Sequence, residues 1–231
     1  MKTKMIYLMV ILSSSFILHA QVKNLGNTPS IFMLTKDQKE LVEGKPSRES
    51  VKQLKNFKRQ GYMEIPGYPS LAKQLDMTKA IQISTDDKGL PRFVVRSYHA
   101  AAEDYIAASK FAEAAMKTSI LGMLESLIED RIKTGIGVEN PSKTELESVS
   151  NMASASKLIA YKKLTNIIIP FSAYKELNNG YEVWIQGAYD KYEIQRVAQE
   201  QAELILKERN EKLMKENDNL LNSDEEYKNF H

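Results

Sequence analysis

The chain of 231 residues contains no cysteine. Disulfide bonds, thiolate nucleophiles and thiolate metal sites are therefore excluded, and so is a lipid anchor attached to cysteine. There are only three histidines, which argues against zinc or iron sites built from histidine clusters. We accordingly predict neither a metal site nor a cofactor.

The sequence also lacks the common motifs of catalysis. It has no glycine-rich phosphate loop, nucleophile elbow or triad spacing. His99 lies in a strand pattern, where we interpret it as a histidine hydrogen-bonded at the sheet surface rather than a general base. Glu125 and Glu129 share a helix face, and Asp130 and Arg131 follow at once, which is typical of a solvated charge cluster. We therefore predict no catalytic residue.

Charge of neither sign dominates, since 32 Lys and Arg stand against 30 Asp and Glu. The beginning of the chain, MKTKMIYLMVILSSSFILHAQ, has the lysines, the apolar stretch and the small Ala20 of a secretory signal peptide. Its apolar run is shorter than the ~20 residues of a membrane span. Removal of residues 1–20 takes away two lysines and leaves a balanced chain, so the electrostatic case for a nucleic-acid partner is absent.

These features predict an exported protein that is periplasmic, outer-membrane-associated or secreted, with no transmembrane span after signal removal. We expect a polar N-terminal extension over residues 21–61, an α+β domain over 62–205, and a helical extension with an acidic tail over 206–231. The mildly basic stretch Lys45–Gln60 is interpreted as part of a solvated, loosely helical extension. Its alternative is a site for acidic surface polymer or anionic lipid.

The middle of the chain predicts a strand that leads into a long helix. Phe93–Ala101 is rich in β-branched and aromatic residues, and AASKFAEAAMKTSILGMLESLIEDR, from Ala107 to Arg131, follows it. Small and apolar residues recur there at steps of four and three, namely Ala107, Phe111, Ala114, Thr118, Leu121, Ile128 and Ile132. Gly122 continues this stripe, and we attribute its presence to close packing, because a mid-helix glycine costs ~1 kcal/mol relative to alanine.

The later elements have their own signals. Ser142 and Glu145 form a capping-box pattern for a second helix that runs to about Tyr161. Alternating apolar residues on both sides of Asn-Asn-Gly predict a β-hairpin, in which Pro170 marks an edge or a bulge. A C-terminal helix carries Leu206, Leu213 and Leu220 at seven-residue intervals, which predicts weak homo-oligomer formation at most.

The fold class we predict is α+β, with a small antiparallel sheet in the order strand, long helix, helix, β-hairpin, C-terminal helix. The helices are expected on one face of the sheet, leaving the other open. Arg96, Tyr98, Tyr174 and Trp184 are predicted on this open face, and such residue types are enriched where partners bind. The alternatives are aromatic pairs that only stabilise the sheet, or a helix that covers the face.

The segment from Gly89 to Tyr192 resembles the LPP-twenty lipoprotein group and related exported proteins of Gram-negative bacteria. The alanine-rich helix and the closing strand carry the resemblance, through Ala107, Ala114, Leu121, Gly122, Trp184, Gly187 and Tyr189. The chain departs from this group in lacking a lipidated cysteine. The resemblance implies a non-enzymatic envelope protein.

We therefore predict an exported cell-envelope protein that is a non-catalytic interaction or structural module. Its partner would be an envelope protein or polymer. The alternative is a metal-independent hydrolase acting on envelope or extracellular polymer.

Overall fold

The computed structural model describes residues 36–137 and 142–228, with side chains described from 38 to 217. The helices are α2 (Lys36–Glu43), α3 (Arg48–Arg59), α4 (Leu71–Gln82), α5 (Tyr105–Ile136), α6 (Lys143–Lys162) and α7 (Lys191–Lys228). The strands are β1 (Met63–Glu64), β2 (Phe93–Ala102), β3 (Ile167–Leu177) and β4 (Gly180–Asp190). The predicted signal peptide lies outside the described residues.

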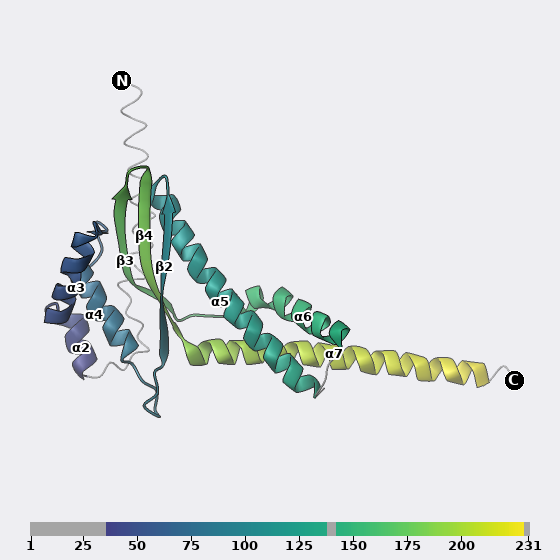
Figure 1. The fold of residues 1–231 in the computed structure, drawn as a ribbon. Coiled ribbons are helices and arrows are strands. Elements are labelled where there is room, and N and C mark those ends of the chain that lie inside the picture. The colour runs from purple at the N-terminus through teal and green to yellow at the C-terminus, as the bar shows by residue number, and fades with distance from the viewer. Residues whose placement is uncertain (1–35, 138–141, 229–231) are drawn as a thin grey trace, which may run out of the picture. The chain divides into compact units, whose positions relative to one another are not determined.

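The strands form one four-stranded sheet in the order β1-β3-β4-β2 (Figure 1), and each neighbouring pair is antiparallel. The α+β class, the antiparallel sheet and the predicted order of elements from β2 to α7 are confirmed. Ahead of them the structure has α2, α3, the short β1 and α4.

The chain divides into two compact units. Unit 1 comprises the residues up to Lys117 together with Asn166–Lys191, and so holds the sheet, α2 to α4 and the first part of α5. Unit 2 comprises Thr118–Thr165 and the residues from Tyr192 onward, and so holds the rest of α5, α6 and nearly all of α7. The single domain that we expected over residues 62–205 is thus shared between two units.

Within unit 1, α3 and α4 cover one face of the sheet. Leu71 of α4 packs in a buried cluster with Phe171 of β3, and Leu54 and Phe57 of α3 pack against it. Leu54 and Phe57 lie three residues apart and therefore point to one side of α3. The expected solvated extension thus contains a helix that contributes to the core.

A buried carboxylate fastens α3 to α4. Asp76 of α4 accepts a hydrogen bond from the backbone N–H of Ser47 at 2.8 Å and another from the Ser50 hydroxyl at 2.8 Å. Ser47 is the N-cap of α3, where backbone N–H groups lack partners within the helix. Asp76 therefore completes the cap from a neighbouring helix.

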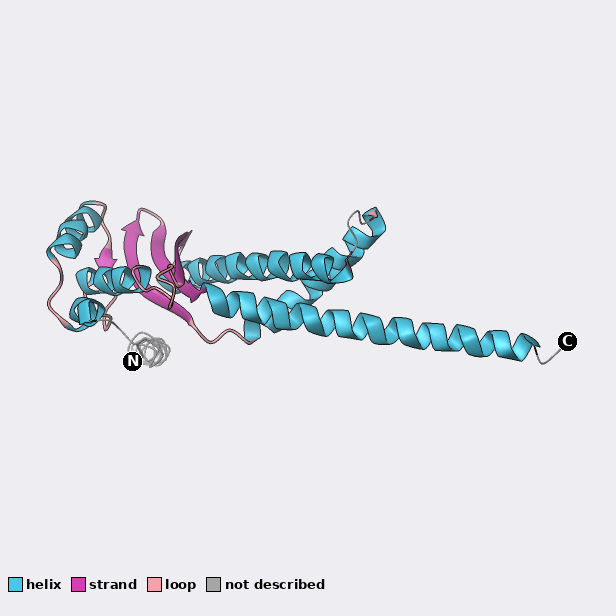
Figure 2. Cartoon of the chain, turned by 90° about the horizontal axis from the view of Figure 1, so that it is seen from below, coloured by secondary structure: helices cyan, strands magenta, loops and turns pink. Residues whose placement is uncertain are grey.

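The opposite face of the sheet is covered by the first part of α5, where Met116 lies directly against Gly187 of β4. Figures 1 and 2 place α3 and α4 on one side of the sheet and the start of α5 on the other. Our expectation that the helices pack on one face is therefore wrong. Both faces are apolar, since β4 buries Val183 and Ile185 toward α5 and Ala188 toward α4.

The buried side of α5 differs from the predicted stripe. Its buried residues recur every four positions, as Ala108, Ala112, Met116, Ile120, Leu124, Ile128 and Ile132. The prediction was right at Ile128 and Ile132, but Phe111 is 58% exposed and Ala114 and Thr118 are also exposed. Four residues advance about 400° around a helix, so this line of burial winds around α5 and an alternating four-and-three pattern cannot follow it.

Gly122 also differs from its predicted role. It lies on the exposed side of α5, and a Cβ at this position would meet nothing within 4 Å. The close approach occurs instead at Gly135, where a Cβ would collide with Leu206 of α7. The predicted close packing of α5 against another helix therefore occurs at Gly135, thirteen residues after Gly122.

Unit 2 is built from the second part of α5, α6 and α7. Lys157 of α6 pairs with Glu125 of α5 at 2.6 Å, and Leu206 of α7 packs at Gly135 of α5. The capping box at the start of α6 is confirmed, because the Ser142 N–H donates to Glu145 at 2.8 Å. Figure 2 shows α7 as one uninterrupted helix.

The hairpin of β3 and β4 is confirmed, with a two-residue turn that pairs Leu177 with Gly180. The register shifts between Ile168 and Phe171, and Pro170 lies inside this bulge as predicted. Proline fits there because it has no N–H to donate to a neighbouring strand.

Candidate functional site

The four residues predicted on an open sheet face do not share a surface. Antiparallel partners point to the same face, and Tyr98 of β2 is paired with Ile185 of β4, whereas Trp184 is paired with His99. Arg96, Tyr98 and Tyr174 therefore lie on the face toward α5, and Trp184 lies on the face toward α3 and α4. A two-residue turn pairs odd with even numbers, so even positions of the two hairpin strands point to opposite faces.

Trp184 is enclosed by other rings. The ring of Phe57 lies 4.7 Å away, that of Tyr62 5.5 Å away, and the imidazole of His99 stacks on the indole at 4.6 Å. The indole N–H is buried without a hydrogen-bond partner among the described residues. Trp184 therefore acts as part of the packing between α3 and the sheet.

A carboxylate beside Trp184 gathers three polar groups. Glu182 accepts from the Tyr62 hydroxyl at 2.6 Å and from Lys175 Nζ at 2.6 Å, and His99 Nδ1 lies 3.5 Å away. Burial acts to raise the pKa of Glu182, but hydrogen bonds from Lys175 and Tyr62 outweigh it and hold this pKa below its usual value. His99 is 45% exposed at the sheet surface, in agreement with its predicted position.

The predicted charge cluster of α5 also forms ion pairs. Glu125 pairs with Lys157, and Glu129 pairs with Lys133 at 2.7 Å. The hydrogen bond from Lys157 lowers the pKa of Glu125. We had interpreted these carboxylates as solvating the helix face, and the structure shows each of them in an ion pair with a lysine.

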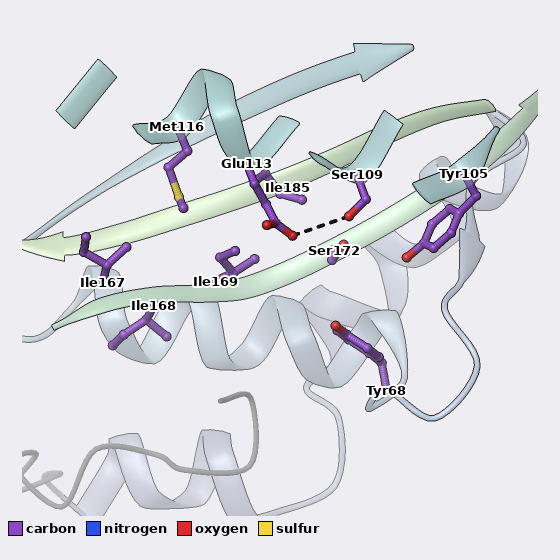
Figure 3. Close-up of a pocket in the computed structure, with 10 residues that line it drawn as sticks. All are labelled: Tyr68, Tyr105, Ser109, Glu113, Met116, Ile167, Ile168, Ile169, Ser172 and Ile185. Atoms are coloured by element: carbon purple, nitrogen blue, oxygen red, sulfur yellow. Dashed lines mark hydrogen bonds between the residues drawn. The ribbon is translucent and has the colours of Figure 1, made fainter. Parts of the chain in front are cut away.

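A pocket of unit 1 offers a more specific arrangement (Figure 3). It is a cavity of about 180 Å³ between the first part of α5 and β3. Its lining combines hydroxyl groups, one carboxylate and apolar side chains, from Tyr68, Tyr105, Ser109, Glu113, Met116, Ile167, Ile168, Ile169, Ser172 and Ile185.

Helix periodicity and a strand irregularity build this pocket. Tyr105, Ser109 and Glu113 follow one another at four-residue steps, which places them along one side of α5. On β3, Ile167 and Ser172 both line the cavity, although a regular strand would point them to opposite faces. The bulge after Ile168 supplies the extra residue that re-aims the strand.

Glu113 determines the electrostatics of the pocket. Figure 3 shows its carboxylate reaching from α5 over β3, with the Ser109 hydroxyl donating to it at 3.5 Å. The pKa of Tyr68 is raised, first by burial and then by the charge of Glu113. Burial likewise raises the pKa of Tyr105, and the nearby Tyr68 and Glu113 raise it further. Both phenols therefore stay neutral around neutral pH.

Tyr174 connects the predicted residues with this pocket, because its ring contacts the edge of Tyr105 with centroids 5.4 Å apart. Our reasoning from the sequence missed Tyr68, Tyr105, Ser109 and Glu113. The available signal was the row of polar residues at four-residue steps in an alanine-rich helix. It was overlooked because the predicted buried stripe ran along a different side of α5.

The described residues contain no group of three or more His, Asp or Glu side chains placed to hold a metal ion. No helix in the same ranges is both long and apolar enough to cross a membrane.

Comparisons with the models of known protein families, with curated proteins and with solved structures found no match for this chain. The resemblance to the LPP-twenty lipoprotein group stays a prediction.

Proposed function

We propose that this chain is an exported, non-catalytic interaction module of the cell envelope, and that unit 1 binds a small ligand or a single side chain of a partner in the pocket beside Glu113. Export is supported by the signal-peptide pattern of residues 1–20. The observation that carries the binding role is the pocket itself, where an apolar floor meets a few polar groups that converge from α5, β3 and Tyr68.

The pocket favours binding over hydrolysis. Acid-base hydrolysis of a polymer would call for two convergent carboxyl groups, as in glycoside hydrolysis. Among the described residues that line the pocket, Glu113 supplies the single carboxylate, and its neighbours are hydroxyl and apolar groups. This arrangement can orient a ligand, but it lacks the pair of groups that the hydrolase alternative needs.

One experiment tests location and binding together. Cells producing the full-length chain are fractionated, and the chain recovered from the non-cytoplasmic fraction is labelled with ¹⁵N and titrated with a library of small polar and apolar fragments. We expect most of the chain outside the cytoplasm, with fragment-induced shifts at Tyr105, Ser109 and Ser172.

The variant Ser109→Phe should abolish these shifts by filling the cavity. Ser126→Phe is the matched control, since Ser126 is exposed on the same helix and outside the pocket. Recovery of the bulk of the chain in the cytoplasm would contradict export. Fragment shifts that persist in Ser109→Phe would contradict the binding role of the pocket.

A further inference from the structure

Building on that proposed function, we infer that the pocket of unit 1 recognises a small organic cation, namely one ammonium group on a short aliphatic stem. Three properties of the pocket lead to this ligand class: its charge, its division into a polar and an apolar end, and its size.

The charge of the lining is negative. Glu113 is ionic, and the other described lining residues are tyrosine, serine, methionine and isoleucine, so no basic side chain lines the cavity. The influence of Glu113 reaches both phenols, because its charge disfavours a second negative charge at Tyr68 and at Tyr105. The charge of Glu113 would repel an anionic ligand in the same way, whereas it would attract a cation.

The polar groups lie at one end of the pocket and the apolar groups at the other. Figure 3 shows Tyr68, Tyr105 and Ser109 on one side of the Glu113 carboxylate, and Met116 and Ile167 on the other side. An ammonium group at Glu113 could donate to the carboxylate and to hydroxyl oxygens. Its stem would then run along the apolar end.

Aromatic rings strengthen the case for a positive head group. Tyr68 and Tyr105 line the polar end, and Tyr174 supports the ring of Tyr105 by an edge contact. The face of a neutral tyrosine ring attracts a cation within ≈ 6 Å of its centroid. A neutral alcohol would lack both this attraction and the charge-assisted hydrogen bond to Glu113.

The size of the cavity limits the ligand. About 180 Å³ is slightly more than the roughly 150 Å³ of an engineered protein cavity that holds benzene. A ligand of roughly five to eight non-hydrogen atoms therefore fits this volume. A butyl or pentyl ammonium ion, or the end of a lysine side chain, has about this size.

Titration of the full-length chain with n-butylammonium, n-butanol and butyrate, followed by amide NMR, tests the inference. We expect n-butylammonium to bind at least about tenfold more tightly than n-butanol, and butyrate to bind most weakly. Glu113→Gln keeps the shape of the side chain but removes its charge, and it should reduce the preference for n-butylammonium about tenfold. Glu40→Gln changes the same residue type on the exposed side of α2 and should leave the preference intact.

The outcomes separate this inference from the proposed function. Equal or tighter binding of n-butanol or butyrate at the pocket would overturn the cation inference and leave the binding role in place. Failure of all probes and fragments to shift pocket resonances would contradict both. Nα-acetyl-lysine methylamide distinguishes the two sources of the cation: binding as tight as that of n-butylammonium assigns a partner's lysine, and weaker binding assigns a free amine.

Discussion

At the scale of single residues, glycine has opposite roles at two positions of the chain. Gly180 begins β4 with a φ of 136°, and a Cβ there would meet the backbone of Ala102 and Glu103. This backbone region is strained for other residues, and backbone atoms cannot move aside as a flexible side chain can. Gly122, in contrast, sits in ordinary helix with open space around it.

We therefore expect Gly122→Ala to raise the free energy of unfolding by about 0.5–1 kcal/mol, because alanine is the better helix former. Gly180→Ala should lower it by about 2 kcal/mol or more, through strain and collision. Urea unfolding of the two variants beside the parent measures both effects. Loss of stability in Gly122→Ala would show that this part of α5 is packed after all.

At the scale of the elements, Glu182 links three parts of unit 1. Its carboxylate lies on β4, Lys175 lies on β3, and Tyr62 lies between α3 and β1. Lys175 Nζ also lies 5.0 Å from the centre of the Tyr62 ring, so the two partners of Glu182 contact each other as well. These contacts attach the segment after α3 to the hairpin.

This arrangement predicts a pH dependence of stability. The pKa of Glu182 is lowered in the folded chain, so its contribution is complete above the unfolded pKa and is lost as the pH falls through the folded value. Glu182→Gln should lower the free energy of unfolding at pH 7 by roughly 1 kcal/mol. Its stability should also fall less steeply than that of the parent between about pH 5 and pH 3.

Denaturant unfolding across this pH range measures the slope. Glu176→Gln serves as the control, since Glu176 is exposed near the end of β3. An identical acid slope in Glu182→Gln and in the parent chain would refute the role of the Glu182 carboxylate.

The β3–β4 hairpin shows which features of an element a sequence can predict and which it cannot. Alternation around Asn-Asn-Gly predicted both strands, and Pro170 predicted the bulge. Which residues of the hairpin share a face depends on the number of residues in the turn, and that number separated Trp184 from Tyr174. One residue of register exchanges the two faces of a strand, so a correct strand prediction can still give the wrong surface.

Helix α5 shows a related limit. Its existence and its end near Gly137 followed from composition and from glycine, whose φ of 68° at this position suits a helix terminus. Its buried side depends on which elements pack along it, and both units contribute to this. The pocket residues Tyr105, Ser109 and Glu113 lay on that unpredicted side, which is why the candidate site was not found from the sequence.

At the scale of the whole molecule, local patterns predicted the α+β class, but the division into two units was not predicted. Each of the long helices α5 and α7 crosses a unit boundary, and nothing in their sequences marks the crossing. The contribution of α3 to the core was missed for a different reason. Leu54 and Phe57 are the apolar residues of α3 that pack against the core cluster, and the six charged residues of this helix make the segment resemble a solvated one.

Self-association through α7 is a further property of the whole molecule. Of the leucines spaced by seven residues, Leu206 packs at Gly135 within unit 2, and Leu213 is 47% exposed. Met214 beside it is 68% exposed. A stable coiled coil needs apolar residues at both core positions over several heptads, and Asn210 and Asn217 occupy the alternate positions here.

We therefore expect weak, concentration-dependent self-association, with a dissociation constant of roughly 10 μM or higher. Leu213→Glu should remove it, because the substitution places a charge at an exposed apolar position of the seven-residue pattern. Gln195→Glu adds the same charge to an exposed position near the start of α7 and should change nothing. Sedimentation velocity over a hundredfold range of concentration measures the equilibrium. A tight dimer that survives Leu213→Glu would mean that another surface of the chain joins the copies, since a single heptad leucine is then not required.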